Sequence, residues 1–324
     1  MNVTVVVVNW NGRKFISECL DGLRKQIFHE FEVVLVDNGS DDGSVGFVAD
    51  NYPEVKIIPL PENLGFSVAN NVALKNIQSE YVAFLNNDAV PVPFWLNSLV
   101  DALEHHPQAG FAASKMLFKD KPTIIDRAGD SYTTAGAGLL RGRGRPADNY
   151  NKQEWVFGTC AGSAIFRIQV LHETGFFDED FFLLYEDVDL SFRAQLRGYK
   201  CLYVPEAVVY HKASSSIVYD SPISVYYSHR NLEWVYIKNM PTRLIFKTVW
   251  LHAVYDIAAF SYFITKGLAS VFIKAKLDSL KGLKSTLKKR WKIQREKRVS
   301  DDYIMKLLDK ELLFPRLTRR LRKN

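Results

Sequence analysis

The N-terminal part of the sequence alternates between segments typical of buried strands and segments with helical spacing. We expect strands at Val3–Val8, Phe31–Val36, Val55–Ile58 and Tyr81–Leu85. We expect the intervening helices at Phe15–Gln26, Ser44–Asn51 and Phe66–Ile77. This alternation predicts an α/β domain whose mostly parallel sheet is covered by helices on both faces. Ligands of such sheets bind beyond the carboxyl ends of the strands, so the residues that follow the strands are the first site candidates.

Polar side chains follow three of these strands. They are Asn9 and Asn11, then Asp37 and Asn38, then Asn87 and Asp88. A carboxylate at a strand end can accept a hydrogen bond from a uracil or thymine ring. Carboxylate and amide oxygens also suit Mg²⁺ or Mn²⁺, which could bridge a diphosphate. Taken singly, the second and third groups are more typical of turns, where Asn, Asp, Gly and Ser are common.

Asn63 and Gly65 precede the helix expected at Phe66–Ile77. Glycine permits close approach to the backbone, and the free amides of a helix N-terminus favour an anion such as a diphosphate. The alternative is a simple helix cap.

An acid-rich segment with interleaved aromatic residues covers positions 178–190. Glu186 and Asp187 precede a helix expected at Val188–Arg197, and the helix dipole favours their ionised form. An ionised carboxylate beside a pocket can take a proton from an acceptor hydroxyl. A capping cluster would explain one of these acids, but not all of them. His211 follows a predicted strand; such a residue is usually structural, but it becomes a metal-ligand candidate if a metal site lies nearby.

Residues 119–153 interrupt the pattern. They are rich in Gly and Arg and have few apolar anchors, so we expect a long loop without secondary structure. It is either a mobile loop beside the site or a surface excursion. Short strands are expected after it, at Trp155–Phe157, Ser163–Arg167, Cys201–Val204 and Val208–Tyr210.

The ordered set of motifs resembles family 2 glycosyltransferases with the GT-A fold, and most of all their bacterial rhamnosyltransferase- and galactofuranosyltransferase-like branch. The matching segments are Val5–Gly12, Val36–Asp41, Asn63–Ser67, Leu85–Asp88, Gly158–Arg167, Glu186–Leu190 and Tyr210–Ser214. The resemblance covers roughly residues 1–240. It implies a Rossmann-like nucleotide-sugar half at 1–118 and an acceptor half at 119–240, followed by a helical appendage at 241–324.

The resemblance also implies roles for single residues. Asp187 would be the catalytic base, with Glu186 as the alternative, and the reaction would invert the anomeric centre. Asp88 and His211 would hold a divalent cation, Mg²⁺ or Mn²⁺, although Asn86 stands where many relatives have Asp. The donor would contact Asn9, Asn11, Asp37, Asn38, Asn63, Gly65, Asn87 and Asp88. The acceptor, a glycan or a lipid-linked glycan, would lie against Gly162 and Ser163.

The charge of the chain is divided unevenly. Residues 241–324 contain 21 Lys and Arg against 7 Asp and Glu, a net charge of +14, whereas the preceding 240 residues have 21 against 29, a net charge of −8. An acidic body argues against nucleic acid as a partner, because phosphate contacts should extend over the folded domain. A basic tail suits an anionic membrane surface.

Two features of the tail suggest how it would meet a membrane. Residues 242–273 are largely apolar but contain Lys247, His252, Asp256 and Lys266, and a charge at the bilayer centre costs roughly 2.5–3.5 kcal/mol. We therefore expect an in-plane or domain-packing helix and no isolated span. Beyond it, an apolar face among many Lys and Arg predicts an interfacial helix: Leu277, Leu280, Leu283, Leu287 and Trp291. A solvated helix packed on its own domain is the alternative.

The three cysteines are far apart and suggest no disulfide framework, and we expect no signal peptide before the first strand. We expect a cytoplasmic enzyme bound peripherally to the inner face of the cell membrane, with oligomers possible. Two other functions remain open. A catalytically silent glycan-binding or scaffold protein would not need Asp88, Asp187 and His211. A sugar-nucleotidyltransferase would need a Gly-rich loop with Arg and Lys after the first strand, where this chain has Asn9-Trp10-Asn11-Gly12.

Overall fold

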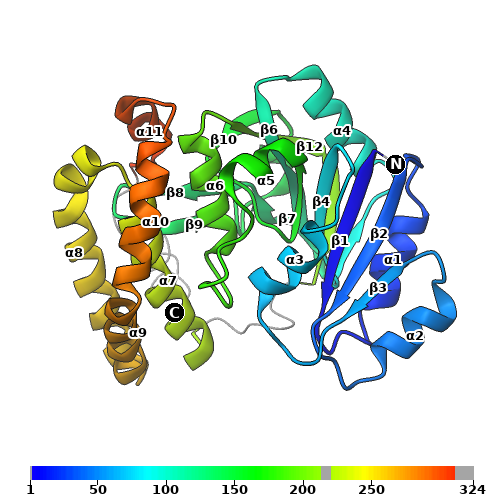
Figure 1. The fold of residues 1–324 in the computed structure, drawn as a ribbon, viewed down its shortest axis with the longest axis horizontal. Coiled ribbons are helices and arrows are strands. Elements are labelled where there is room, and N and C mark those ends of the chain that lie inside the picture. The colour runs from blue at the N-terminus through cyan, green and yellow to red at the C-terminus, as the bar shows by residue number, and fades with distance from the viewer. Residues whose placement is uncertain (1, 213–219, 311–324) are drawn as a thin grey trace.

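The computed structural model describes residues 2–212 and 220–310, and this part of the chain forms one large mixed sheet flanked by helices (Figure 1). The large sheet contains β1 (Val3–Asn9), β2 (Phe31–Asp37), β3 (Lys56–Pro59), β4 (Tyr81–Asn86), β5 (Ala89–Pro91), β6 (Ala109–Phe118), β7 (Lys121–Ala128), β10 (Glu154–Val156), β11 (Ser163–Arg167) and β12 (Lys200–His211), whereas β8 (Asp130–Tyr132) and β9 (Gly138–Leu140) pair with each other in a separate two-stranded sheet. The helices are α1 (Ile16–Arg24), α2 (Ser44–Asn51), α3 (Phe66–Leu74), α4 (Trp95–His105), α5 (Ile168–Thr174), α6 (Glu186–Leu196), α7 (Pro222–Asn239), α8 (Thr242–Thr265), α9 (Ala269–Lys281), α10 (Leu283–Arg295) and α11 (Asp301–Leu307), with a 3₁₀ turn, η1, at Ala147–Tyr150.

Four parallel strands form the N-terminal half of the sheet, in the order β3-β2-β1-β4. In this register Asn9 lies opposite Asp37, and Val8 lies opposite Asn86. The polar residues at the strand ends therefore meet at one edge of the sheet, as the sequence predicts. The other half is mixed, because β11 runs antiparallel to β4 and β6, whereas β12 runs parallel to β6.

Helices cover both faces of the sheet because both faces are apolar. Val5 and Val7 of β1 pack in a core shared with α1, α2 and α4, whereas Val6 packs in a second core with α3, α5 and α6. The continuous β-branched run of this strand is therefore buried on both sides, as its composition predicts.

Helices α7 to α11 form a further layer beside α6, on the left of Figure 1. One core joins this layer to α6 and contains Phe192 of α6, Val235 of α7, Leu244 of α8 and Ile304 of α11. The helical layer therefore begins with α7. This helix precedes residue 241, where the net charge of the sequence changes from negative to positive.

Residues 119–153 do not form the unstructured loop that we expected from their composition. They contain β7, β9, η1 and β8, and β7 extends the sheet by pairing with β6. Gly129, Gly136, Gly142 and Gly144 have positive φ angles and make the turns between these short elements. The expectation was wrong because glycines that serve tight turns give the same composition as a flexible loop.

Two other expected elements differ in the structure. The strands expected at 201–204 and 208–210 are one strand, β12, whose register with β6 shifts between Val204 and Val208. The apolar stretch from Leu277 to Trp291 is not a single helix, because α9 ends at Lys281 and α10 begins at Leu283. A Cβ atom on the intervening Gly282 would lie 2.5 Å from the Trp234 ring, so close packing against α7 requires glycine there. The last part of the basic tail, residues 311–324, lies outside the described residues.

Helix α8 buries two of its polar side chains and exposes several of its large apolar ones. Thr248 and His252 are buried and bond to residues of α7, whereas Phe246, Trp250 and Ile257 are 78%, 60% and 67% exposed. In the described part of the chain, α8 is also the one helix whose length and composition would allow it to cross a membrane. An exposed apolar face of this kind is typical of an interaction surface.

Candidate active site

A cavity of about 700 Å³ lies between the carboxyl-terminal edge of the sheet and helices α7 and α8. Residues of β4, β7, β12 and the start of α6 line its polar end. Apolar and aromatic side chains of α7 and α8 line its other end. Most of the residues predicted from the sequence line it: Asn38, Asn63, Gly65, Asn87, Asp88, Gly162, Glu186, Asp187 and His211.

Asp88 and His211 meet at the polar end of the cavity. Nε2 of His211 lies 3.2 Å from Oδ1 of Asp88, and Nδ1 lies 2.7 Å from Oδ2 of Asp126 on β7. Burial lowers the pKa of the imidazole, but the hydrogen bonds to Asp126 and Asp88 outweigh burial and raise this pKa to about 9. One imidazole nitrogen and one carboxylate oxygen are thus placed side by side, and a second carboxylate fixes the ring.

Glu186 and Asp187 begin α6 at the cavity wall. Oδ1 of Asp187 accepts a hydrogen bond from the Val188 amide at 2.7 Å, and Oδ2 lies 3.4 Å from the guanidinium of Arg127 on β7. Glu186 has no hydrogen bond to another residue of the described chain, and its buried Oε2 atom has no partner. Burial, followed by the charge of Asp187, raises the pKa of Glu186 to about 8, so this carboxyl group is mostly neutral at pH 7.

Helix α7 holds the turn that leads into α6. Leu184 and Tyr185 have φ angles of 66° and 72°, which L residues rarely adopt. The side-chain amide of Asn231 donates to the carbonyls of Leu183 and Leu184, at 2.9 and 2.7 Å. Because this turn directly precedes Glu186, α7 determines where the two acids of α6 meet the cavity.

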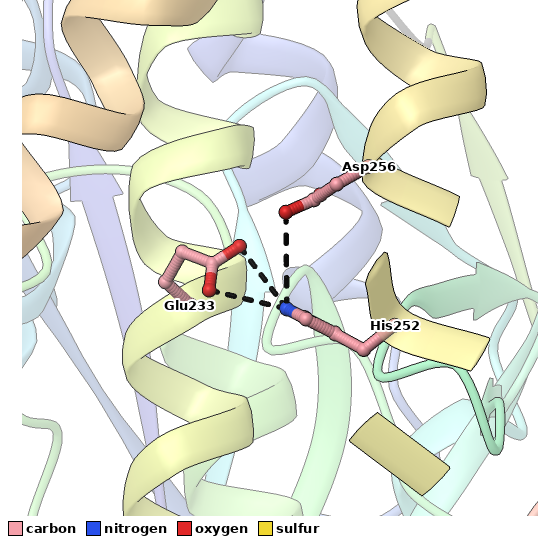
Figure 2. A group of neighbouring side chains, drawn as sticks. All are labelled: Glu233, His252 and Asp256. Atoms are coloured by element: carbon pink, nitrogen blue, oxygen red, sulfur yellow. Dashed lines mark hydrogen bonds and ion pairs between the residues drawn. The ribbon is translucent and has the colours of Figure 1, made fainter. Parts of the chain in front are cut away.

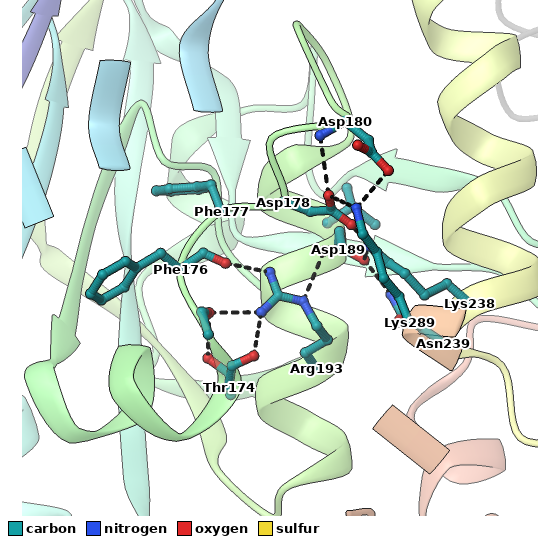
Figure 3. Close-up of polar contacts among 12 residues, drawn as sticks. Thr174, Phe176, Phe177, Asp178, Asp180, Asp189, Arg193, Lys238, Asn239 and Lys289 are labelled. Atoms are coloured by element: carbon teal, nitrogen blue, oxygen red, sulfur yellow. Dashed lines mark hydrogen bonds and ion pairs between the residues drawn. The ribbon is translucent and has the colours of Figure 1, made fainter. Parts of the chain in front are cut away.

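The other acids of the segment join helices (Figure 3). Lys238 of α7 contacts Asp178 and lies 2.8 Å from Asp189, while Lys289 of α10 contacts Asp178 and lies 2.5 Å from Asp180. The acid-rich pattern therefore serves two purposes: ion pairs that attach the helical layer, and two carboxyl groups at the cavity.

A second group of ligand-type side chains lies where α7, α8 and α9 meet (Figure 2). Nε2 of His252 lies 3.1 Å from Oε2 of Glu233 and 4.0 Å from Asp256. Lys276 of α9 contacts Glu233 and lies 2.6 Å from Asp256, so an ammonium group already supplies positive charge to both carboxylates. We therefore assign this cluster to helix packing.

Hydrogen bonds connect the donor candidates at the ends of β1 and β2. The Asn9 amide donates to Asp37 at 2.9 Å, and its oxygen accepts from Asn87 at 2.8 Å. Asp37 also accepts from the Ser40 amide at 3.0 Å, and Asn11 lies in the exposed turn beside it. Neither Asn9, Asn11 nor Asp37 lines the cavity, so their contact with the donor stays a prediction.

Gly65 allows α3 to approach the acid-rich segment. Its φ is 86°, and a Cβ atom there would lie 2.6 Å from the carbonyl oxygen of Phe182. The Phe66 amide donates to that same carbonyl at 2.8 Å, so this amide of the helix N-terminus is not open to an anion. The Asn38 amide donates to Asn63 at 2.9 Å and fixes the preceding turn.

The two acceptor candidates lie in different surroundings. Gly162 lines the cavity, where a Cβ atom would lie 2.9 Å from the Asn86 amide. Ser163 is buried away from the cavity wall; its hydroxyl donates to Ser114 at 2.8 Å and accepts from the Trp95 indole at 3.0 Å. Its position supports a role in the core, and not the expected contact with an acceptor.

Residues 4–175, more than half of the chain, match the family model described as glycosyl transferase family 2. The chain belongs to glycosyl transferase family 2. This glycosyltransferase is 28% identical over 246 residues to the N-acetylglucosaminyl-diphospho-decaprenol L-rhamnosyltransferase of Mycobacterium tuberculosis, a match that covers 65% of this chain and 76% of the relative.

Solved structures of glycosyltransferases share the fold. The mannosyltransferase PcManGT from Pyrobaculum calidifontis, in complex with GDP-Man and Mn²⁺, has a TM-score of 0.55 at 19% identity, over 94% of this chain and 85% of that one. Residues 1–349 of Staphylococcus aureus TarS, in complex with UDP, have a TM-score of 0.52 at 24% identity, over 74% of this chain and 66% of that one. The GT-A fold expected from the sequence is confirmed.

Two important residues of this glycosyltransferase were missed from the sequence. Asp126, which holds His211, and Arg127, which contacts Asp187, lie in the region that we expected to be a loop. A signal was present, because the β-branched run Thr123–Ile125 is followed by these polar residues, as in the strands that were recognised. Trp10, 49% exposed at the cavity wall, was also missed as a site residue.

Proposed function

We propose that this glycosyltransferase moves a sugar from a UDP- or dTDP-sugar to a hydroxyl of a cell-envelope glycan or lipid-linked glycan, with inversion and with a divalent cation. The observation that carries this proposal is that the Asp88–His211 pair and Asp187 line a single cavity. Its relatives support it: one is named for a lipid-linked diphosphate acceptor, and two structural neighbours contain UDP or GDP-Man.

A divalent cation would bind at the polar end of the cavity, where it would displace the proton that the raised pKa of His211 leaves on the ring at pH 7. Asp88 and His211 would hold Mg²⁺ or Mn²⁺ with a carboxylate oxygen and an imidazole nitrogen, which lie 3.2 Å apart. The contact between Asp126 and the other ring nitrogen is the kind that orients a metal-ligating histidine. When bound, the cation supplies positive charge that stabilises the diphosphate leaving group.

Asp187 acts as the general base in this proposal. Its carboxylate accepts the proton of the acceptor hydroxyl, and the hydroxyl oxygen attacks the anomeric carbon from the face opposite the diphosphate. The bond between that carbon and the diphosphate oxygen breaks, and the nucleoside diphosphate leaves with the electron pair. Arg127 and the Val188 amide hold the carboxylate in place, and no bond between sugar and protein forms.

The test is release of nucleoside diphosphate from a panel of UDP-, dTDP- and GDP-sugars, with Mn²⁺ or with a chelator. The acceptor probe is N-acetylglucosaminyl diphosphate linked to a farnesyl chain. We expect one UDP- or dTDP-sugar to be consumed only when both the cation and the acceptor probe are present. Binding of the probe without consumption of any nucleotide sugar would favour a silent glycan-binding protein, and pyrophosphate release from a nucleoside triphosphate would favour a nucleotidyltransferase.

We also propose that helices α8 to α10 hold the enzyme against the anionic inner face of the cell membrane. Like α8, helices α9 and α10 expose large apolar side chains, which are Leu277, Leu280, Leu287 and Trp291. Exposed lysines accompany them at positions 274, 281, 284, 288 and 292. Apolar side chains among lysines suit a surface with anionic headgroups above hydrocarbon. A second copy of the chain is the alternative partner for this face.

A further inference from the structure

Glu186 differs from every other acid at the wall of the cavity. Within the described residues, each of the others has a charged or hydrogen-bonding partner: His211 contacts Asp88 and Asp126, and Arg127 contacts Asp130 and Asp187, while Tyr262 contacts Asp220. Glu186 lines the same cavity, is only 7% exposed, and has no hydrogen bond to another described residue. A buried polar group with no partner among the described residues points to a partner that arrives with the substrate.

The charged groups that face Glu186 come from two elements. Asp187 and Asp189 lie on its own helix α6, and Arg127 lies on β7. Burial has the largest effect and the charge of Asp187 the next, and both raise the pKa of Glu186; its own backbone amide and Arg127 lower it less, and the result is a pKa of about 8. A neutral carboxyl group at pH 7 has an O–H that can donate, whereas a carboxylate can only accept.

We propose that Glu186 is a positioning residue that donates a hydrogen bond, as a neutral carboxyl group, to an acceptor oxygen next to the hydroxyl that Asp187 deprotonates. The inference rests on the proposed function, in which Asp187 is the base. The division of roles is chemically consistent because two adjacent carboxylates would compete for the same proton, whereas a donor beside an acceptor can hold a sugar at two points. The proton of Glu186 stays on Glu186 throughout, and only the acceptor hydroxyl loses its proton, to Asp187.

The first test compares Glu186→Gln with Glu186→Ala, using the farnesyl-linked N-acetylglucosaminyl diphosphate as acceptor. Glutamine is nearly isosteric and donates through its amide, so it should keep kcat and acceptor KM near the wild-type values. Alanine should raise the acceptor KM by about tenfold, as loss of one neutral hydrogen bond predicts, with donor affinity unchanged. If glutamine impairs transfer as severely as alanine while both variants bind the donor normally, Glu186 acts as a carboxylate and the proposal is overturned.

The pH profile gives a readout that a merely structural role would not change. In the wild type, kcat/KM for this acceptor should fall as the pH rises through about 8, because ionised Glu186 can no longer donate. Glu186→Gln should lack this fall. An unchanged alkaline limb in Glu186→Gln would contradict the proposal.

The second test needs no turnover. Infrared difference spectra between wild type and Glu186→Gln should contain the C=O band of a protonated carboxyl group at pH 7, and this band should disappear above pH 8. Absence of the band at pH 7 would overturn the proposal whatever the enzyme transfers. Conversely, normal transfer by Asp187→Asn would overturn the assigned base but leave this band in place, so failures of the two proposals are distinguishable.

Discussion

Glu186 and Asp187 are neighbours in sequence, yet they meet the cavity in different surroundings. Asp187 is contacted by Arg127, whereas Glu186 is buried without a partner among the described residues. The sequence shows two adjacent acids at a helix start, and nothing in it distinguishes them. Arg127, on a strand 60 residues before Asp187, contacts Asp187 alone of the two, and the sequence pattern could not predict this difference in surroundings.

This difference predicts a pH dependence of stability. The pKa of Glu186 is 4.5 as an ordinary glutamate and about 8 in the fold, so the folded protein binds more protons than the unfolded chain between these values. The contribution of the neutral carboxyl group to stability is complete below pH 4.5 and is lost as the pH rises through 8.

Urea denaturation at about pH 5, 7 and 9 can measure this contribution. The free energy of unfolding of the wild type should fall relative to that of Glu186→Gln as the pH rises. Parallel stability curves for the two proteins would show that Glu186 is ionised in the fold.

The Asp88–His211 pair leads to a second prediction. Asp88→Ala should abolish the gain in donor affinity that Mn²⁺ provides, because one of the two proposed ligands is lost, while the fold is retained. Calorimetry with the donor selected from the panel, with and without Mn²⁺, measures the gain. The matched control is Asp50→Ala, which removes an exposed carboxylate on α2. Unchanged donor affinity of Asp88→Ala in Mn²⁺ would contradict the metal-ligand role.

At the scale of elements, regular patterns were predictable and turn-rich ones were not. The strands β1, β2 and β4 lie where the β-branched runs predict them, and the register brings Asn9, Asp37 and Asn86 to one edge of the sheet. Strand β7 was missed because it lies among short elements joined by glycine turns. Because this strand was not predicted, Asp126 and Arg127, which lie in it, were not predicted as site residues either.

The contact between α3 and the acid-rich segment gives a prediction for Gly65. Gly65→Ala should destabilise the fold by about 1–3 kcal/mol, because alanine is strained at a φ of 86° and its Cβ would overlap Phe182. Transfer should also decrease, because the displaced segment carries the two acids of α6. Gly46→Ala is the control, since no atom lies within 4 Å of a Cβ there in helix α2, and it should stabilise by roughly 0.5–1 kcal/mol. If the two variants were equally stable, α3 and the acid-rich segment would not be closely packed at Gly65.

At the scale of the whole molecule, the helical layer both supports the site and presents an apolar surface. It attaches to the acid-rich segment through Lys238 and Lys289, and Asn231 shapes the turn before α6. The sequence shows that His252 and Asp256 interrupt the apolar stretch of α8, but it does not show which way they face. In the structure Thr248 and His252 bond to α7, whereas Phe246, Trp250 and Ile257 are exposed.

This surface predicts vesicle binding that depends on α8. The 324-residue protein should co-sediment with phosphatidylglycerol vesicles at low salt, and less so as salt rises, because juxtamembrane Lys and Arg contribute about 1 kcal/mol each and are screened. Replacing Phe246, Trp250 and Ile257 by Gln should weaken binding by at least about tenfold, since each loses burial in hydrocarbon.

The control for this prediction replaces two exposed aromatic residues outside the helical layer, Phe94 and Trp155, by Gln. Point substitutions are preferable to removal of residues 275–324, because α9 supplies the carbonyl that accepts from Trp234. A wild-type protein that stays in the supernatant at low salt would contradict membrane docking and favour a second copy on this face, which sedimentation equilibrium would detect.

The proposed mechanism is tested most directly by comparing donor binding and sugar transfer in Asp187→Asn. The variant should bind the nucleotide-sugar donor with wild-type affinity in the presence of Mn²⁺, because the donor candidates and the Asp88–His211 pair are untouched. Its rate of transfer to the farnesyl-linked acceptor should fall by at least ~10²-fold, the loss expected for a general base. Transfer at a rate near that of the wild type would contradict the assignment of Asp187 and with it the proposed mechanism.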